Sequence, residues 1–540
     1  MPRTPSLDDA ATPDSADRES WIAALSRPET YPHPAGDIVR YHTHISDVFA
    51  AGDYAYKLKR PVNLGFVDFS TLEKRRAACE DEVRLNRRLA PDIYLGVVAV
   101  CDVDGRPRIL PGGCPAGAPI DYAVQMRRMP ADGMLDVLAA RGGLTREHVI
   151  DIARQVAGFH ARAEHGAEIA RYGRPEAVAA PMRENFAQTE KYVGVSLDAG
   201  RFASLRDYAE AFVGAHTTLF EARIAAGRIV DGHGDLHLRN MCLMDGRVVI
   251  FDCIEFNRAL RAGDAISDIA FLTMDLDDRS LSDLGNVFLN AYLERSGDYA
   301  GLRLLDFYQV YRAYVRGKVI SFLLDEPQPE TERAQRLGEA RAYFDLAERY
   351  LAPRAPALLI TCGVSGSGKT TVARAAAERL AAVTVRSDVV RKQLAGVPLE
   401  PARPRAYGAG IYTAEWTDRT YASLLDHARD ILAAGRRAIL DASYATRRRR
   451  AAARALAAAL GVPFVILHCT AERAELERRL DARQAAGRDV SDATRALLDE
   501  QFTRFEPPDD AEGAVLTVRK AADLDALATT VTGAALDSMT

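Results

Sequence analysis

The chain has 540 residues, with 70 Lys and Arg residues against 75 Asp and Glu residues, so its formal charge is −5. A composition of 48% hydrophobic and 27% charged residues is typical of an ordinary globular protein, and it excludes collagen, a disulfide mini-scaffold and disorder along the whole chain. At roughly 100–200 residues per domain, this length predicts about three or four domains. Lysine occurs at only eight positions, so we expect some of them to be sites that require a compact ammonium group.

The cellular compartment is predicted from the cysteines and from the N-terminal segment. The seven cysteines are scattered without a CxxC pair, which favours reduced thiols in the cytoplasm over a disulfide framework or a zinc site. Residues 1–20 are rich in Pro, Ser and Asp and have no apolar core, so they are predicted to form a disordered tail. No run of 18 apolar residues occurs, and no membrane partner is expected.

The predicted elements of the first 350 residues change from strands to helices along the chain. Strand-like runs occur at residues 45–70, 93–101 and 120–126. A helix is predicted from Glu73 to Leu89, and from about residue 131 the pattern is mostly helical, with short strands near 241–252. A small lobe at about 30–128 before a large helical lobe at about 129–350 is the general layout of protein-kinase-like phosphotransferases.

A domain boundary is predicted where this helical pattern ends. The segment Leu351-Ala-Pro-Arg-Ala-Pro356 has two prolines after a charged helical stretch. It predicts a linker at 351–357 between a first domain at 21–350 and a second at 358–540.

The segment His233-Gly-Asp-Leu-His-Leu-Arg-Asn240 contains the first cluster of chemistry-bearing residues. Asp235 precedes Asn240 by five positions, which is the spacing of the kinase catalytic loop. Asp252 ends the apolar strand 248–251, which follows an Asp245-Gly246 turn of hairpin type. Such a set provides one carboxylate for an attacking hydroxyl, with an amide oxygen and a second carboxylate for a metal ion.

This segment resembles the aminoglycoside phosphotransferase and choline kinase branch of the kinase superfamily. The resemblance implies that Asp235 is the catalytic base and that Asn240 and Asp252 hold Mg²⁺. It also implies that Asp268 anchors the catalytic loop and is structural. Where many kinases have Phe-Gly after the metal-binding aspartate, this chain has Cys253-Ile254, a departure common in this branch.

By the same resemblance, the small lobe supplies a lysine to the α and β phosphates of ATP. Lys57 and Lys59 share one face of a predicted strand, so either can point inward. Lys57 is preferred because it resembles the lysine of the hydrophobic-x-Lys strand in the family. Glu82 is its predicted ion-pair partner, with Glu80 as the alternative. Met126 follows a strand and is assigned either to the hinge against adenine or to the core.

A second motif lies between a buried strand at 358–361 and a predicted helix. It has the pattern GxxxxGK[ST] in its strand–loop–helix context, in which backbone N–H groups and the helix N-terminus face phosphates. Lys369 is predicted to reach the β and γ phosphates, and Thr370 to bind Mg²⁺. The predicted nucleotide-binding residues are Gly363, Ser365, Gly366, Ser367, Gly368, Lys369, Thr370 and Thr371. The fold class is therefore α/β and α+β: a protein-kinase-like bilobal domain, then a P-loop NTPase domain with a parallel sheet flanked by helices.

The acceptor side of this second site is predicted from a further strand. Asp388 ends that strand and Arg391 follows three positions later, which resembles small kinases of the polynucleotide kinase and zeta-toxin type. The resemblance implies that Asp388 is the catalytic base and that Arg391 grips the substrate. Asp441 ends a third strand and is predicted either to support Mg²⁺ or to cap the next helix. Arg479 and Arg483 resemble the lid arginines of gluconate kinase and are predicted to contact the nucleotide.

Nearly the whole chain resembles bacterial proteins that fuse an aminoglycoside-phosphotransferase-like domain to a P-loop kinase-like ATPase domain. The leading hypothesis is a bifunctional, cytoplasmic phosphotransferase that uses ATP and Mg²⁺ and phosphorylates small polar acceptors of the sugar, amino sugar or amino alcohol class. One alternative makes one domain catalytic and the other an ATP-binding regulator. Another makes the P-loop domain a toxin-like or nucleic-acid-end kinase, with the Arg447–Arg450 run as the contact. The oligomeric state is not predicted.

Overall fold

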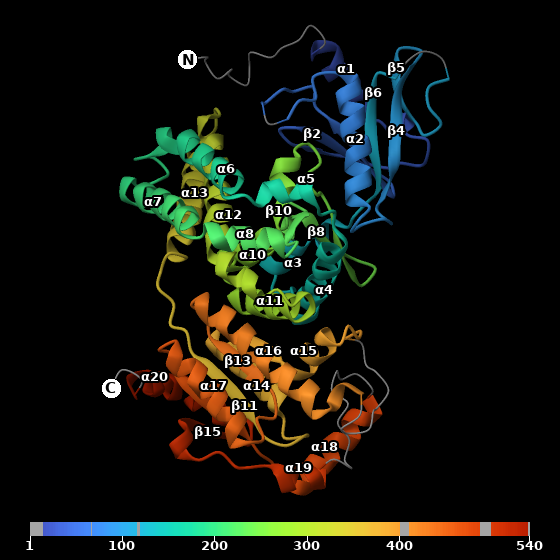
Figure 1. Ribbon diagram of the computed structural model, residues 1–540. Coiled ribbons are helices and arrows are strands. Elements are labelled where there is room, and N and C mark those ends of the chain that lie inside the picture. The colour runs from blue at the N-terminus through green and yellow to red at the C-terminus, as the bar shows by residue number, and fades with distance from the viewer. Residues whose placement is uncertain (1–14, 66, 116–118, 400–409, 487–497, 538–540) are drawn as a thin grey trace. The chain divides into compact units, whose positions relative to one another are not determined.

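The computed structural model describes residues 15–65, 67–115, 119–399, 410–486 and 498–537 (Figure 1). The chain forms two compact units. The first comprises Met1–Leu144, Arg162–Val178 and Thr217–Leu272, and the second comprises Thr145–Ala161, Ala179–His216 and Thr273–Thr540. The linker predicted at 351–357 lies inside the second unit, so a domain boundary there stays a prediction.

The N-terminal segment differs from the prediction over its last residues. Residues 1–14 lie outside the described residues, but residues 15–20 belong to helix α1 (Ser15–Ala24). The predicted disordered tail is therefore wrong for residues 15–20. The physical reason is burial of apolar surface: Ile22 and Leu25 lie in the core of the first unit.

A six-stranded antiparallel sheet forms the predicted small lobe. In spatial order its strands are β1 (Val39–His42), β2 (Ser46–Ala51), β3 (Tyr54–Lys59), β6 (Asp121–Arg127), β4 (Tyr94–Val103) and β5 (Arg106–Leu110). Helix α2 (Leu72–Asn86) packs on β4 and β6. The Thr71 side chain caps this helix by accepting a hydrogen bond from Lys74 N. The helix ends at Asn86, earlier than the predicted Leu89.

A disulfide connects strand β4 to the segment that follows β5. It joins Cys101 to Cys114, which corrects the expectation that all cysteines are thiols. The free cysteines of the described residues are all buried: Cys79, Cys242, Cys253, Cys362 and Cys469. The hairpin brings the two Cα atoms to 5.5 Å, a distance that a disulfide can bridge. Because this proximity comes from strand pairing, the spacing of the two cysteines in the sequence does not indicate it.

The other strands of the first unit surround a loop between β7 (Ile229–Asp231) and β8 (Met241–Met244). β7 pairs with β10 (Ala262–Asp264), and β8 pairs with β9 (Arg247–Ile250). In the turn before β9, Asp245 and Gly246 both have positive φ, as the predicted hairpin turn requires. The helices here are α3 (Leu135–Ala140), α5 (Ala167–Ala170), α8 (Thr217–Ala225), α9 (Arg258–Arg261) and α10 (Ala265–Asp278), which continues into the second unit.

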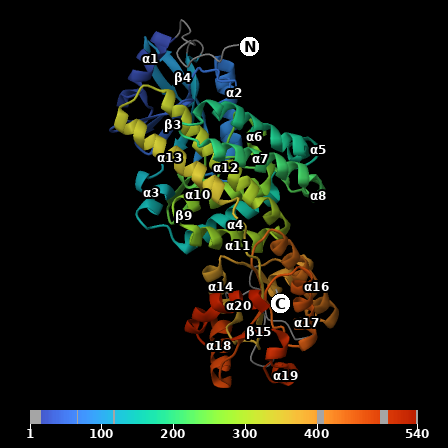
Figure 2. The ribbon, with the colours of Figure 1, turned by 90° about the vertical axis from the view of Figure 1, so that its left-hand side faces the viewer.

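Before the predicted linker, the second unit is helical. Its helices there are most of α4 (Arg146–Arg162) and of α6 (Pro175–Thr189), together with α7 (Ala199–Ala215), α11 (Ser282–Ser296), α12 (Leu302–Phe322) and α13 (Glu330–Arg349). Helices α12 and α13 lie side by side (Figure 2). A Cβ at Gly317 would lie 2.9 Å from the Phe344 ring, so glycine allows this close approach. Within the described residues, no helix is both long and apolar enough to cross a membrane.

The rest of the second unit contains a five-stranded parallel sheet flanked by helices. In spatial order the strands are β12 (Val383–Arg386), β13 (Ala438–Asp441), β11 (Leu358–Cys362), β14 (Phe464–Cys469) and β15 (Ala514–Val518). The helices are α14 (Lys369–Leu380), α15 (Ser387–Leu394), α16 (Ala414–Ala433), α17 (Arg447–Ala459), α18 (Arg473–Ala486), α19 (Leu498–Arg504) and α20 (Leu527–Asp537). Every residue of β11, β12 and β13 is buried, as expected for parallel strands covered on both faces. The predicted fold class is confirmed.

Helix α11 covers the outer edge of β12. Asn290 Oδ1 accepts hydrogen bonds from Thr384 N at 2.7 Å and Thr384 Oγ1 at 2.9 Å, and Asn290 Nδ2 donates to Ala382 O at 3.0 Å. The Asn290 amide thus pairs with one backbone N–H group and one backbone carbonyl at the edge of the sheet, as a neighbouring strand would. Asn286 Nδ2 also donates to Ala382 O, at 3.2 Å. The sheet edge is therefore completed by a helix that precedes the predicted linker.

We expect Asn290→Ala to destabilise the second unit by about 1–3 kcal/mol, because it leaves the buried Thr384 N–H without its acceptor. Urea unfolding of the full chain, followed by circular dichroism, measures the loss. Asn286→Ala is the matched control and should cost less, since Ala382 O keeps its bond from Asn290. Equal losses for the two variants would contradict this account of the edge.

Candidate active sites

The loop that contains Asp235 is held by Asp268 of α10. The Asp268 carboxylate accepts hydrogen bonds from His233 N at 2.8 Å and from Gly234 N at 2.9 Å. A Cβ at Gly232 would lie 2.7 Å from Asp268 Oδ2, and Gly234 has a φ of +83°. These glycines let the loop close on the carboxylate, so Asp268 lies where the resemblance placed an anchor.

Asp235 and Asn240 are joined across this loop. Asn240 Nδ2 donates to Asp235 Oδ2 at 2.9 Å and to Asp235 O at 3.0 Å, which directs the amide nitrogen toward the aspartate and leaves the amide oxygen as the possible metal ligand. The Asp235 side chain is 37% exposed, so a hydroxyl can approach it. His237 Nε2 lies 3.3 Å from Asp235 Oδ2.

His233 is a structural residue of the loop. Its Nε2 bonds to Phe251 O at 3.0 Å, and its Nδ1 accepts a hydrogen bond from Asp235 N at 3.2 Å. Burial lowers the pKa of His233, which favours the neutral ring that these two bonds require. The ring therefore fixes the backbone on both sides of the predicted metal site.

Asp252 follows β9 in a left-handed conformation, with a φ of +61°. A non-glycine residue keeps such a backbone only where its surroundings impose it. Here Asp252 N donates to Tyr94 Oη at 3.2 Å, and Cys253 N donates to Asn86 Oδ1 at 2.8 Å. Lys57 Nζ donates to Asp252 Oδ1 at 2.6 Å, so the strained turn places a carboxylate beside an ammonium group.

Asn240 and Asp252 fit a magnesium ion that binds together with nucleotide phosphates. Both offer the oxygen ligands that Mg²⁺ prefers, and Mg²⁺ is usually bound by one or two carboxylates plus substrate phosphates. Among the described residues there is no group of three or more His, Cys, Asp or Glu side chains suited to a metal by itself. Two protein ligands would leave positions for phosphate oxygens and waters.

The two lysines of β3 have different surroundings. Lys57 Nζ lies 2.6 Å from Asp252 Oδ1 and 2.9 Å from Glu82 Oε1. Lys59 is fully buried, and its Nζ lies 2.5 Å from Glu82 Oε2 and also bonds to Glu255 Oε1. Lys57 thus lies beside the predicted metal ligand, whereas the structure places Lys59 in the core and not at the nucleotide site.

Glu82 of α2 contacts both lysines. It is the residue that the sequence favours over Glu80 as the ion-pair partner of Lys57. Burial alone would raise its pKa, but Lys57 and Lys59 hold the pKa of Glu82 below its usual value. The alternative partner, Glu80, is wrong: it is exposed and bonds to Arg76 Nε at 2.9 Å.

Two further residues of this site differ from expectation. Met126 lies in a buried apolar cluster with Val124, so it occupies a core position and the hinge assignment is not supported. Glu255 was missed, because its partner Lys59 lies far away in the chain and Glu255 stands outside the catalytic-loop motif. It follows Asp252 by three positions, so the Lys59–Glu255 pair ties the segment of the metal ligand to β3.

We expect Lys59→Met to destabilise the first unit by about 3–5 kcal/mol, because it leaves the buried Glu255 without its cation. Lys57→Met should cost less stability, since the Asp252 side chain is 40% exposed. Thermal unfolding of the full chain measures both. The double variant Lys59→Met with Glu255→Gln should recover most of the loss, and failure of this rescue would contradict the pairing.

In the second unit, a phosphate-binding loop follows β11. Gly366 and Gly368 have φ values of +80° and +89°, and a Cβ at Gly363 would lie 2.3 Å from Cys469 O. Glycine is thus required at three positions of the motif. Lys369 begins α14, and its Nζ donates to Val364 O at 2.8 Å.

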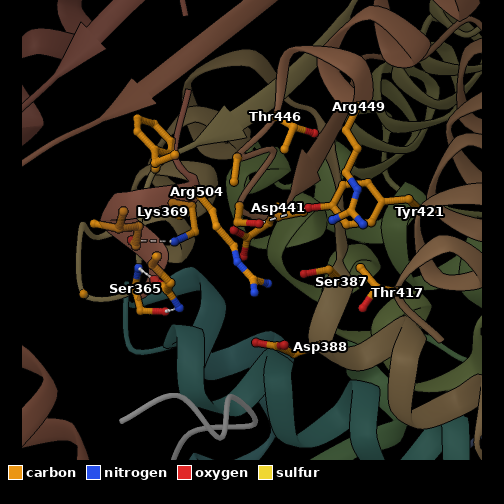
Figure 3. Close-up of a pocket in the computed structure, with 18 of the residues that line it drawn as sticks. Ser365, Lys369, Ser387, Asp388, Thr417, Tyr421, Asp441, Thr446, Arg449 and Arg504 are labelled. Carbon is orange, nitrogen blue, oxygen red and sulfur yellow. Dashed lines mark hydrogen bonds between the residues drawn. The ribbon is translucent and has the colours of Figure 1, made fainter. Parts of the chain in front are cut away.

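The loop borders a cavity of about 1110 Å³ (Figure 3). The predicted residues that line it are Gly363, Ser365, Gly366, Gly368, Lys369, Thr370, Thr371, Asp388, Arg391 and Arg479. Ser367 is a buried residue of the loop, and the side chain of Arg483 lies outside the described residues. Arg479 Nε bonds to Glu475 Oε1 at 2.6 Å, beside the loop.

Gln501 of α19 contacts the loop and was missed as a site residue. Its Oε1 accepts a hydrogen bond from Ser365 N at 2.7 Å, and its Nε2 donates to Ser365 Oγ at 2.9 Å. The two partners lie 136 residues apart in the chain, so the fold is needed to reveal this contact.

Asp441 supports the predicted magnesium residue Thr370. Thr370 Oγ1 donates to Asp441 Oδ2 at 2.8 Å, and the cap of α17 is Thr446, so the helix-cap alternative does not hold. Burial raises the pKa of Asp441, and Arg386 opposes the shift. Arg386 lies 3.7 Å from Asp441 Oδ2 and 2.9 Å from Glu294 Oε1 of α11. These contacts orient a hydroxyl and a carboxylate whose oxygens are of the kind that Mg²⁺ prefers.

The family model of the AAA domain matches residues 358–508, which include the phosphate-binding loop. The uncharacterized protein Rv2004c of Mycobacterium tuberculosis (strain H37Rv) is 34% identical over 470 residues, covering 86% of this chain and 91% of the relative. The uncharacterized protein Mb2027c of Mycobacterium bovis gives the same values.

Solved structures of kinases are also similar to parts of the chain. The choline/ethanolamine kinase family protein from Mesorhizobium loti is 14% identical, covers 62% of this chain and 98% of its own, and has a TM-score of 0.36. A gluconokinase from Sinorhizobium meliloti is 22% identical, covers 34% of this chain and 95% of its own, and has a TM-score of 0.24.

Proposed function

The chain belongs to the family of the mycobacterial protein Rv2004c, and from the two sites above we propose that it is a bifunctional ATP-dependent phosphotransferase. Each site transfers the γ-phosphoryl group of ATP to a hydroxyl group of a small polar acceptor. The observation that carries this proposal is the presence of two sets of active-site side chains. Each set has a lysine, oxygen donors suited to Mg²⁺ and a carboxylate that an acceptor can reach. ATP as the donor supports a cytoplasmic location.

At the first site, Asp235 accepts the proton of the acceptor hydroxyl and directs its oxygen toward the γ-phosphorus. The new oxygen–phosphorus bond forms while the bond to the β-phosphate oxygen breaks and ADP leaves. Lys57 contacts the α and β phosphates, and Asn240 and Asp252 hold the magnesium ion. Bound Mg²⁺ neutralises charge on the phosphates.

At the second site, the residues take the same roles on a different scaffold. Asp388 accepts the proton of the acceptor hydroxyl, and Lys369 contacts the β and γ phosphates. Thr370 holds the magnesium ion, with its hydroxyl oriented by Asp441. The backbone N–H groups of the loop and the N-terminus of α14 stabilise the phosphate charge.

Nucleic acid is not proposed as the acceptor, because the Arg447–Arg450 run is paired with acidic residues. Arg450 is buried and bonds to Glu512 at 2.7 Å, and Arg447 bonds to Asp509. Two of the four arginines are therefore held by carboxylates of their own, so the run does not form the continuous basic patch that binding of a phosphate backbone requires.

An untargeted metabolite screen with Mg·ATP tests the proposal. The full-length protein should form two classes of phosphorylated product, of which Asp235→Asn removes one and Lys369→Met the other. Loss of both products in either variant would support a single catalytic site regulated by the other domain.

A further inference from the structure

We propose that the acceptor of the P-loop site carries an anionic group, a carboxylate or a phosphate, and that Arg391 and Arg449 bind it. This inference rests on the proposed function, because it names the class of acceptor for that site. It replaces the general sugar, amino sugar or amino alcohol class there with hydroxy acids and phosphorylated hydroxyl compounds.

The cavity has room for an acceptor beyond the nucleotide phosphates. Its volume of about 1110 Å³ lies slightly above the range of typical small-molecule sites, which is roughly 300–1,000 Å³. In Figure 3, Thr417, Tyr421 and Arg449 lie across the cavity from Lys369, and Asp388 lies at its lower border, on the side of Thr417. An acceptor whose hydroxyl meets Asp388 therefore extends toward Arg449.

Arg391 lies in this part of the cavity wall and is 7% exposed. Its Nη1 donates to Ile411 O at 2.8 Å and to Thr417 Oγ1 at 3.3 Å, and its guanidinium lies 5.0 Å from the centre of the Tyr412 ring. In the part of the chain that the structure describes, its Nε has no hydrogen-bond partner. A buried cation with an unsatisfied donor is costly, and burial lowers the pKa of Arg391. A bound anion relieves this cost.

Arg449 faces the same space from α17. Its guanidinium lies 4.3 Å from the centre of the Tyr421 ring. That ring is fixed, because Tyr421 Oη bonds to Ser443 Oγ at 3.1 Å and accepts a hydrogen bond from Tyr444 N at 3.1 Å. Stacking on a fixed ring preorients the planar guanidinium for a carboxylate or a phosphate.

The charges near the acceptor end select against a cation. Arg386 is matched by Glu294 and Asp441, so it does not add to the excess. Within the described ranges of the chain, the acidic contact of Arg449 is Asp418, at 3.3 Å, and this carboxylate also lies 3.6 Å from Arg448. Asp388 also acts electrostatically on Arg391. Among the described residues near this wall, three arginines (Arg391, Arg448 and Arg449) still face two carboxylates (Asp388 and Asp418), so an amino group placed between two guanidinium groups would be repelled.

Matched acceptors that differ in charge test the proposal. The full-length protein with Asp235→Asn, in which the first site is silent, is assayed for ADP release with D-gluconate against D-glucose, and with D-ribose 5-phosphate against D-ribose. We expect higher kcat/KM for the anionic member of at least one pair. The pair that shows this preference tells whether the site binds a carboxylate or a phosphate. Arg449→Gln should raise KM for that acceptor roughly tenfold to a hundredfold with the KM for ATP unchanged. Arg429 is an exposed residue of α16 that does not line the cavity. Arg429→Gln should therefore change neither the KM for the acceptor nor the KM for ATP.

A binding measurement makes the test independent of turnover. With Mg·AMP-PNP saturating the nucleotide site, calorimetry measures the binding of inorganic phosphate, D-gluconate and D-ribose 5-phosphate to the Asp235→Asn protein and to its Arg449→Gln variant. Arg449-dependent binding without any turnover would refute catalysis at this site but support the anion site. Turnover of neutral sugars alone, equal effects of Arg449→Gln and Arg429→Gln, or no binding of any of these anions would overturn the inference.

Discussion

Lys369→Met should lower phosphoryl transfer at the P-loop site by roughly 10²–10³-fold, the loss expected when one group that stabilises transition-state charge is removed. The ammonium group lies at the N-terminus of α14 and is held 2.8 Å from Val364 O, inside the loop whose backbone faces the phosphates. Methionine keeps much of the side-chain volume and removes the charge. Products formed from [γ-³²P]ATP by the full-length protein measure the effect.

Two comparisons make this result specific. Lys520→Met removes an exposed lysine of the same unit and should leave both products unchanged. The product of the first site should also persist in Lys369→Met, because Lys57 and Asp235 belong to the other compact unit. If Lys369→Met leaves every phosphorylated product unchanged, the two-site proposal is wrong.

The parts of these sites that could be predicted from the sequence lie within short segments. The loop from Asp235 to Asn240 and the loop from Gly363 to Thr370 hold their groups in one local backbone arrangement, so residue spacing determines which groups lie together. The parallel sheet was also predictable, because its strands are short apolar runs that alternate with helices.

The parts that could not be predicted depend on contacts between distant segments. Lys57 and Lys59 share one strand face, and only their distant partners, Asp252 for Lys57 and Glu255 for Lys59, distinguish them. Likewise, Asn290 completes the edge of β12 from a helix that a linker prediction assigns to the other domain. The Cys101 disulfide depends on a hairpin register in the same way. Sequence patterns do not report such pairings, because each partner alone is an ordinary polar residue.

Asp235→Asn should abolish most phosphoryl transfer at the first site, with a loss of roughly 10²–10⁴-fold, the usual contribution of a positioned general base. An asparagine has the same shape and retains an oxygen for the hydrogen bond from Asn240 Nδ2, which lies 2.9 Å from Asp235 Oδ2. It cannot accept the proton of the acceptor hydroxyl at neutral pH. The variant should therefore bind ATP with unchanged affinity and remain folded, while kcat falls.

The control is Asp245→Asn, in the exposed turn between β8 and β9, where the side chain is 75% exposed. Asparagine also tolerates the φ of +52° at this position, so activity and stability should both be preserved. Calorimetric titration with Mg·AMP-PNP separates binding from chemistry in each variant. A fall in nucleotide affinity equal to the fall in rate would show that Asp235 binds the nucleotide complex and is not the base, because a base acts on the acceptor hydroxyl.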